Sequence, residues 1–311
     1  MKAPIRVGIV GLGYMGRLHL RRALESPRAQ VTALYDPAPD SVKELRMQSL
    51  PVVESYEQLL ERVEAVIIAS PTSTHGVYAA AALRAQKHVF IEKPVTATAE
   101  ELEMLLRLQE EVGVVTMVGH VERFNPAFQA LWPFRSEFSQ YVFERIAPWT
   151  PRGSDASVIL DLLIHDLDLF WALTEGRVAD IRLAAYRTLT RQADTVHLWI
   201  DLVDGRGASF LVSRTAPHKR RRLVANGPTL WCEGDFLQRT AQGWRLQGEQ
   251  YIPLALEIPS MDALAAELEH FLSSIQEGRA TSLSLEHVHS VMSWAWQVEA
   301  LAEHRLLFAP Q

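Results

Sequence analysis

Short apolar runs recur along the first part of the chain and alternate with stretches in which apolar positions return every three or four residues. The runs occupy residues 5–10, 31–35, 65–69, 88–91 and 114–118. Continuous runs of this length are typical of strands buried on both faces, and the intervening spacing is typical of helices. The pattern predicts an α/β domain over residues 1–120, built on a doubly wound parallel sheet.

Polar residues in front of the helical stretches indicate where those helices begin. Asp40 and Ser55 are candidate N-caps, and Thr98 stands three residues before Glu101 in the pattern of a capping box.

The rhythm changes after Gly119, which predicts a second domain over residues 121–311. We expect a short helix at 126–131, a strand at 137–146 and a buried helix at 158–173. From 181 to 256, strand-like runs are separated by the turn signals Asp204-Gly205, Asn226-Gly227 and Gln242-Gly243, which favours an antiparallel or mixed sheet. Two helices, 261–276 and 285–304, close the chain, and the last of them could fold back onto the first domain.

Composition excludes several classes of partner. The formal net charge of −6 gives no electrostatic reason to expect binding to nucleic acid or to an acidic membrane. Cys232 is the only cysteine, so we expect no internal disulfide and a reducing compartment. No targeting or membrane-spanning segment is visible, and a cytoplasmic protein is the expectation.

A glycine motif directly follows the first strand and opens a helix. The segment reads Gly11-Leu12-Gly13-Tyr14-Met15-Gly16, and this context is the one that a dinucleotide-binding fingerprint requires. Asp36 ends the second strand, where a carboxylate would accept hydrogen bonds from the ribose hydroxyls and repel a 2′-phosphate. The sequence therefore predicts NAD rather than NADP, although Lys43 could approach a phosphate; the alternative is a plain glycine turn beside a solvated aspartate.

Polar residues also follow the next two strands, at the edge where an open α/β sheet binds its ligands. They are Ser70, Pro71, Thr72 and His75 after the third strand, and Glu92, Lys93 and Pro94 after the fourth. A lysine ammonium there would stabilise developing alkoxide charge beside the nicotinamide. Taken alone, Glu92 and Lys93 could equally be a surface ion pair.

Three ionisable residues interrupt the apolar helix predicted at 158–173. Asp161 and His165 are four residues apart and share a helical face, and Asp168 lies three residues after His165. Imidazole suits the general-base step of alcohol oxidation. The alternative is a core histidine satisfied by one of the aspartates. A metal site is not predicted, since one histidine with carboxylates lacks a second imidazole or thiolate.

Together, the glycine loop, Ser70-Pro71 with His75, Glu92-Lys93-Pro94, and Asp161 with His165 resemble the Gfo/Idh/MocA oxidoreductases. The resemblance implies a Rossmann domain, a second α/β domain with a large open sheet whose outer face mediates homo-oligomerisation, and the catalytic residues Lys93, Asp161 and His165. Many members have a glycine between the aspartate and the histidine, whereas this chain has Leu162-Leu163-Ile164.

Two segments resemble the branch of the family that oxidises the 3-hydroxyl of UDP-N-acetylglucosamine: residues 119–126 and 152–155. The resemblance implies a nucleotide-sugar substrate held by Arg123, Asn125, Arg152 and Asp161, because arginine suits bidentate phosphate contacts. In that branch the keto sugar passes to a pyridoxal-phosphate aminotransferase, for lipid A or another surface polysaccharide. The basic run 219–222 matches a diphosphate in charge, but a solvated strand end is the commoner explanation.

Two other functions remain open at this stage. One is a dehydrogenase of a free sugar or an inositol-type polyol, and the other is a cofactor-binding regulatory protein without catalysis. The presence of Lys93, Asp161 and His165 together disfavours the second.

Overall fold

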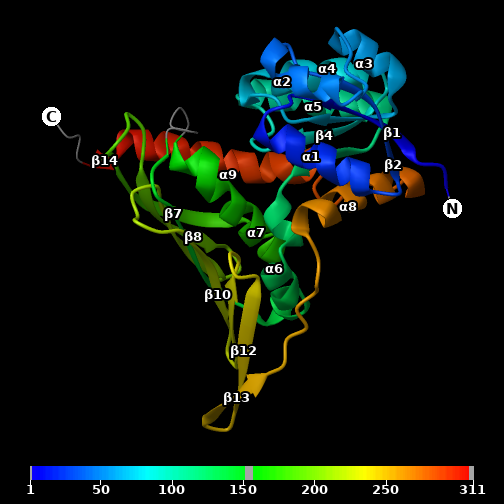
Figure 1. The fold of residues 1–311 in the computed structure, drawn as a ribbon. Helices are drawn as coiled ribbons and strands as arrows, with labels where there is room; N and C mark the ends of the chain where they lie inside the picture. The colour runs from blue at the N-terminus through cyan, green and yellow to red at the C-terminus, as the bar shows by residue number, and fades with distance from the viewer. Residues whose placement is uncertain (1, 151–156, 308–311) are drawn as a thin grey trace. The chain divides into compact units, whose positions relative to one another are not determined.

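The computed structural model describes residues 2–150 and 157–307. The chain divides into two compact units, one formed by residues 1–121 with 264–290, the other by 122–263 with 291–311 (Figure 1). We call them the N-terminal and the C-terminal unit. The single domain boundary predicted near residue 120 does not describe this arrangement, because residues 264–290 belong to the N-terminal unit.

The N-terminal unit is built on the predicted parallel sheet. Its strands are β1 (Ile5–Val10), β2 (Ala29–Tyr35), β3 (Ala65–Ile68), β4 (His88–Glu92) and β5 (Thr116–Gly119). They pair in parallel in the order β2-β1-β3-β4-β5. The order reverses between β1 and β3, and such a switch point opens a crevice for ligands at the carboxyl ends of the strands.

Helices join these strands: α1 (Tyr14–Glu25), α2 (Pro39–Met47), α3 (Tyr56–Arg62), α4 (His75–Arg84) and α5 (Ala99–Val112). Ser55 and Thr98 are N-caps, as predicted, and their side chains accept from the backbone N–H groups of Gln58 and Glu101. The prediction for Asp40 is wrong, because α2 begins one residue earlier at a proline, whose fixed φ suits the first helical position.

The segment that returns to this unit begins with α8 (Ala263–Glu277), the helix before the last one. Phe271 of α8 packs edge-on against Phe90 of β4, with ring centroids 5.8 Å apart. Further along, Leu283 O accepts from Val118 N and Thr281 Oγ1 donates to Thr116 O. These bonds fix the segment beside β5. Apolar periodicity finds α8 but carries no information about which domain it joins.

The C-terminal unit contains a nine-stranded mixed sheet in the order β13-β12-β11-β10-β6-β9-β8-β7-β14. Its members are β6 (Gln140–Ile146), β7 (Val178–Tyr186), β8 (Thr195–Leu202), β9 (Gly207–Ser213), β10 (Arg220–Asn226), β11 (Leu230–Asp235), β12 (Thr240–Gln247), β13 (Gln250–Leu254) and β14 (Leu306–Leu307). The pairs β6–β9 and β7–β14 are parallel, and the other neighbours are antiparallel.

Two sequence expectations within this sheet need correction. Gly243 is not in a turn: it lies inside β12 opposite Cys232, where a Cβ would come within 3.0 Å of the cysteine Sγ. The strand expected at 137–146 begins only at Gln140, because Trp132–Glu137 forms a 3-10 helix with a proline in its first turn.

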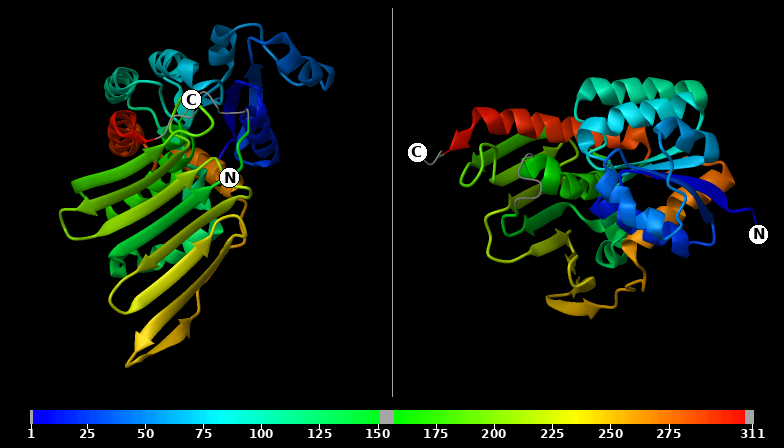
Figure 2. Two further views of the ribbon diagram at one scale, coloured as in Figure 1. Left: turned by 90° about the vertical axis from the view of Figure 1, so that its left-hand side faces the viewer. Right: turned by 45° about the horizontal axis from the view of Figure 1, so that its top comes forward.

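Helices cover one face of the C-terminal sheet, and an aromatic core fills the space between. They include α6 (Pro126–Leu131), α7 (Ile164–Thr174) and the later part of α9 (Leu285–His304) (Figure 1). Phe170 of α7 packs on Tyr141 and Phe210 from the sheet and on Trp294 from α9. In the left view of Figure 2, no helix within the described part of the chain crosses the opposite face.

None of the helices among the described residues is both long and apolar enough to span a membrane.

Candidate functional site

The glycine loop after β1 has the backbone that the sequence motif requires. Gly11 adopts φ +85°, and a Cβ there would lie 2.4 Å from Ser70 N in the neighbouring loop. A Cβ on Gly16 would lie 1.8 Å from Gly11 O. Both positions therefore need glycine, one for the turn and the other for the close approach of α1 to the loop.

The first turn of α1 offers an open anion site. Its N-cap, Gly13, makes no side-chain cap, and the first turn holds no acidic residue. A Cβ on Gly13 would meet nothing within 4 Å, so a phosphate has room to reach the helix N–H groups. Tyr14 is exposed and Met15 half-buried beside this opening. The loop thus fits a pyrophosphate.

Asp36 lies directly against the same loop. Its Oδ2 accepts from Leu12 N at 2.7 Å and its Oδ1 from Ala38 N at 2.8 Å. The carboxylate is therefore fixed at the end of β2, beside the glycine loop. This is the place from which an acidic residue can bind ribose hydroxyls.

A buried histidine joins the loops after β3 and β4. His75 Nε2 lies 2.8 Å from Ser70 O, and its Nδ1 lies 2.9 Å from Pro94 O. Pro71 is exposed and Thr72 half-buried at the start of this segment. His75 itself is only 1% exposed, so it holds the two loops together and is not itself a contact surface for a ligand.

Glu92, at the end of β4, binds α1 and the neighbouring lysine. Its Oε1 lies 2.6 Å from His19 Nε2, and its Oε2 accepts from Lys93 N at 3.2 Å. Burial alone would raise the pKa of the Glu92 carboxyl, but the hydrogen bond from His19 and the nearby cationic charge outweigh it and hold that pKa below its ordinary value. Glu92 is therefore an internal support for Lys93, whose side chain is half-buried.

Asp161 and His165 lie where a π-helical turn, Ile159–Leu163, passes into α7. Ile164 N bonds to Ile159 O, five residues back, so the stretch is not the uninterrupted α-helix that the sequence predicts. Both side chains are half-buried, in a segment whose other side chains are largely buried. Single π-turns inside α-helices are frequent at functional sites, because they change the angle at which side chains project.

Asp168 pairs with Arg123, a contact that the spacing along the helix did not suggest. Arg123 Nε and Nη2 donate to the two Asp168 oxygens at 2.6 and 3.1 Å, and both residues are buried. Asn125 caps α6 and donates to Glu122 and to Phe236 O. Because buried charges and amides need such partners, Arg123 and Asn125 have structural contacts and we do not retain them as substrate ligands. Arg152 lies outside the described residues.

A second buried ion network, which the sequence analysis missed, lies beneath α7. Arg145 is 1% exposed; its Nη2 lies 2.7 Å from Asp166 and its Nη1 2.9 Å from Glu122. Arg221 also reaches Glu122, at 3.0 Å. Burial raises the pKa of Asp166. Burial would also raise the pKa of Glu122, but Arg145 and Arg221 outweigh it and hold the pKa of Glu122 below its usual range. Buried and exposed side chains alternate along β6, and Arg145 occupies one of the buried positions. This alternation could have predicted from the sequence that Arg145 is buried.

The basic run 219–222 is part of the sheet and is paired there. Arg220 binds Glu144, Arg221 binds Glu122 and Arg222 binds Glu233. The explanation as a strand end thus holds for its three arginines. Among the described residues, no group of three histidine, cysteine or acidic side chains is placed to hold a metal ion.

A switch-point sheet with a glycine loop, an open helix N-terminus and a fixed acidic residue defines a nucleotide-binding protein of the Rossmann class. The comparisons agree. Residues 5–120 match the model described as the oxidoreductase family, NAD-binding Rossmann fold, and residues 130–233 match the GFO/IDH/MocA C-terminal domain. The chain belongs to the GFO/IDH/MocA oxidoreductase family.

Individual relatives extend this likeness over the whole chain. A UDP-N-acetylglucosamine 3-dehydrogenase from Acidithiobacillus ferrooxidans is 33% identical, with 96% of this chain and 97% of the relative covered. A solved structure of UDP-N-acetylglucosamine 3-dehydrogenase from that organism has a TM-score of 0.91 at 31% identity and covers 98% of this chain and 99% of its own. An inositol 2-dehydrogenase from Acidothermus cellulolyticus is 28% identical, with 90% and 87% covered. A levoglucosan dehydrogenase solved with NADH shares the fold, with a TM-score of 0.86 at 18% identity and 99% and 100% covered.

Proposed function

We propose that this protein oxidises a hydroxyl of a nucleotide sugar, specifically the 3-hydroxyl of UDP-N-acetylglucosamine, to the keto sugar. The observation that carries the proposal is the likeness to a UDP-N-acetylglucosamine 3-dehydrogenase, which spans both units at 33% identity. The candidate residues Lys93, Asp161 and His165 are all present.

NAD is the proposed cofactor, and when bound it supplies the hydride acceptor. Gly11, Gly13 and Gly16 would hold its pyrophosphate at α1, and Asp36 would accept from a ribose. Asp36 favours NAD over NADP because its charge opposes a 2′-phosphate.

Alcohol oxidation also releases a proton, and His165 is the proposed base that takes it from the hydroxyl oxygen. The C–H bond supplies the hydride, the O–H bond supplies the proton, and the carbon–oxygen double bond remains on the sugar. Lys93 would stabilise the alkoxide-like oxygen, and Asp161 would orient the sugar or the imidazole.

The outer face of the C-terminal sheet supports the proposal of a homo-oligomer. One row across the sheet holds Val142, Val224 and Trp199, with Val142 49% and Trp199 43% exposed. Trp231 and Trp244 pack together on the same face, with ring centroids 5.1 Å apart. Apolar side chains gathered on an uncovered sheet face fit a second copy of that face.

We further propose that the protein acts in the cytoplasm and that its keto product is consumed by a pyridoxal-phosphate aminotransferase, as part of lipid A or surface polysaccharide formation. The aminotransferase step follows from the proposed substrate, because a 3-keto group is what a transaminating enzyme converts to an amine.

A dehydrogenase of inositol or another free polyol is the second candidate, favoured by the 28% identity to an inositol 2-dehydrogenase. The experiment incubates purified protein and NAD with UDP-N-acetylglucosamine, N-acetylglucosamine or myo-inositol, and follows nicotinamide absorbance. Reduction with the nucleotide sugar alone is expected. Reduction only with myo-inositol would overturn the proposal in favour of the second candidate.

A further inference from the structure

A cavity in the C-terminal unit lies between one loop and one helix. The loop joins β7 to β8, and the helix is the later part of α9. The cavity has a volume of about 250 Å³. Its lining residues are Arg187, Arg191, Gln192 and Ala193 from the loop and Glu299, Ala302 and Glu303 from α9.

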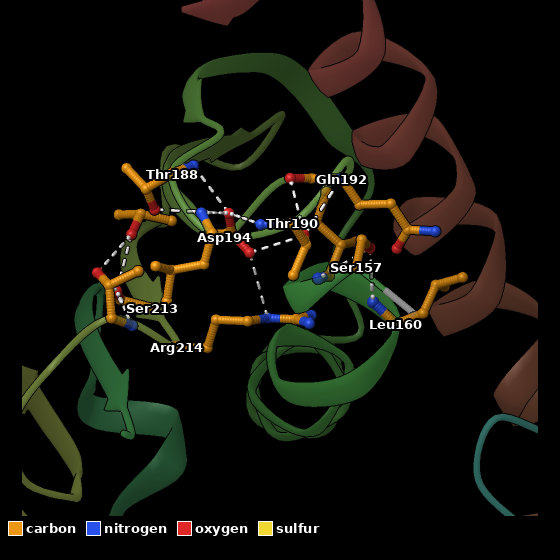
Figure 3. Close-up of polar contacts among 12 residues, drawn as sticks. Ser157, Leu160, Thr188, Thr190, Gln192, Asp194, Ser213 and Arg214 are labelled. Atoms are coloured by element: carbon orange, nitrogen blue, oxygen red, sulfur yellow. Dashed lines mark hydrogen bonds and ion pairs between the residues drawn. The ribbon is translucent and has the colours of Figure 1, made fainter. Parts of the chain in front are cut away.

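A buried aspartate fixes the shape of this loop (Figure 3). Asp194 Oδ2 accepts from the backbone N–H groups of Thr188, Leu189 and Thr190 at 2.6–2.9 Å, and Oδ1 accepts from Thr190 Oγ1. Burial would raise the pKa of Asp194, but these backbone bonds outweigh it and lower that pKa. The loop is therefore held in one shape by a stable carboxylate, which is what a preformed binding site needs.

Among the residues that the structure describes, the two arginines of the loop have no acidic partner. Neither Arg187 nor Arg191 forms an ion pair with any residue in the described part of the chain, and Arg187 Nε is buried there without a hydrogen-bond partner. Arg182, on the preceding strand, pairs with Asp180 and Asp201. A buried N–H without an acceptor costs free energy, so Arg187 is suited to an acceptor that arrives from outside the chain.

Two carboxyl groups, those of Glu299 and Glu303, also line the cavity. Ser157 Oγ donates to Glu299 Oε2 at 2.5 Å, and burial raises the pKa of Glu299 above its ordinary value. Glu303 is exposed at the rim. The cavity is therefore lined by two arginines from the loop and by two glutamates from α9.

The cavity also adjoins the start of the segment that carries Asp161. Ala193 O accepts from Val158 N, and Ser157 Oγ accepts from Ile159 N and Leu160 N (Figure 3). Ala193, which follows the two arginines in the loop, therefore bonds directly to Val158, the residue in front of the π-helical turn.

We propose that Arg187 and Arg191 bind the diphosphate of the nucleotide-sugar substrate. Guanidinium groups match phosphate oxygens in charge and in bidentate geometry. A pocket for a whole ligand usually measures roughly 300–1,000 Å³, and this cavity is smaller. Its size is therefore suited to one charged part of a larger substrate. This inference rests on the proposed function, and it replaces Arg123, which Asp168 already engages.

The test measures calorimetric binding of UDP and of uridine to the full chain and to the variants Arg187→Gln, Arg187→Lys and Arg191→Gln. Arg182→Gln is the matched control, an arginine at the surface of the adjoining strand. We expect UDP to bind wild type more tightly than uridine, each glutamine variant to weaken UDP at least about tenfold, and uridine binding and the control to stay unchanged. In turnover, the KM for the nucleotide sugar should rise with kcat nearly constant.

Different failures separate the inference from the proposed function. Wild type that binds UDP while all arginine variants bind it equally well would overturn the diphosphate site alone. Equal loss of UDP and uridine in the variants would do the same, because the arginines would then act on something other than phosphate. Wild type that binds no UDP would contradict the proposed substrate and the site with it. Arg191 is exposed, so Arg191→Gln keeps the test valid if Arg187→Gln does not fold.

Discussion

His19 and Glu92 form a buried pair, with His19 Nε2 2.6 Å from Glu92 Oε1 and side-chain exposures of 1% and 11%. His19 belongs to α1, whose N-terminus is the proposed phosphate site, and Glu92 precedes Lys93. Within the described part of the chain, His19 Nδ1 is buried and has no partner, so Nε2 makes the polar contact of the ring. The pair therefore connects the cofactor loop with the lysine proposed to act in catalysis.

We expect His19→Leu to lower turnover and weaken NAD binding together, because Glu92 would lose its buried donor and shift both α1 and Lys93. His19→Gln can donate to Glu92 and should restore much of both. Steady-state kinetics and NAD titration give the two readouts. If the leucine variant matched wild type in both, the pair would have no positioning role.

Glu92 should also make stability depend on acid pH. A carboxyl whose pKa is lower in the folded protein stabilises the fold at pH values above 4.5, the pKa of the carboxyl in the unfolded chain. This contribution is lost as the pH falls through the pKa of the folded state. The difference in free energy of unfolding between wild type and Glu92→Gln should therefore be largest near neutral pH and shrink below about pH 4.5. Urea titrations from about pH 3 to 7 measure it. A constant difference across that range would contradict the lowered pKa.

Asp36→Ala should weaken NAD more than NADP, because it removes a ribose acceptor and a charge that opposes a 2′-phosphate. The substitution also removes the bonds to Leu12 N and Ala38 N, which affects both cofactors, so the ratio of the two dissociation constants is the informative quantity. Asp40→Ala, on the exposed start of α2, is the control. An unchanged ratio would remove Asp36 from cofactor selection.

Arg145→Met should destabilise the protein by about 3–5 kcal/mol, since it leaves Glu122 and Asp166 buried without their shared cation. Arg182→Met removes an exposed ion pair and should cost less than about 1 kcal/mol. Denaturant unfolding measures both variants. Similar losses would mean that Arg145 is not the main counter-charge of this network.

The sequence predicted the sheet of the N-terminal unit closely, because strands buried on both faces appear as uninterrupted apolar runs. The run at 5–10 coincides with β1, and the motif after it defines the loop. Apolar periodicity could not predict that α8 returns to that unit. Such a pattern shows that a helix has an apolar face, but it does not show what that face packs against. The π-turn before α7 was equally hidden, because one extra residue per turn leaves an apolar stretch apolar.

In the candidate site, too, features set by local sequence could be predicted, and contacts between distant residues could not. The backbone of the loop at Gly11 and Gly16, and the place of Asp36 beside it, agree with the sequence motif, because these features depend on local structure next to a strand end. The ion pair of Arg123 could not be foreseen, since its partner Asp168 lies 45 residues away and only the fold brings them together. Arg187 and Arg191 gave no signal in the sequence, because the side chains that lie near an arginine are known only once the chain has folded.

His165→Ala tests the chemistry itself. The cofactor can accept only the hydride, so the hydroxyl proton needs a base, and an imidazole is effective near neutral pH. Turnover should fall by roughly 10² or more, with NAD binding nearly intact, since His165 lies outside the unit that holds the glycine loop. His218→Ala, an exposed histidine on the loop between β9 and β10, is the matched control. The pH profile separates a base from a structural residue, because losing the base removes the acidic limb of the wild-type profile, whereas losing only packing lowers the rate equally at every pH. Wild-type turnover by His165→Ala across pH would exclude His165 as the base and leave Lys93 and Asp161 to be tested in its place.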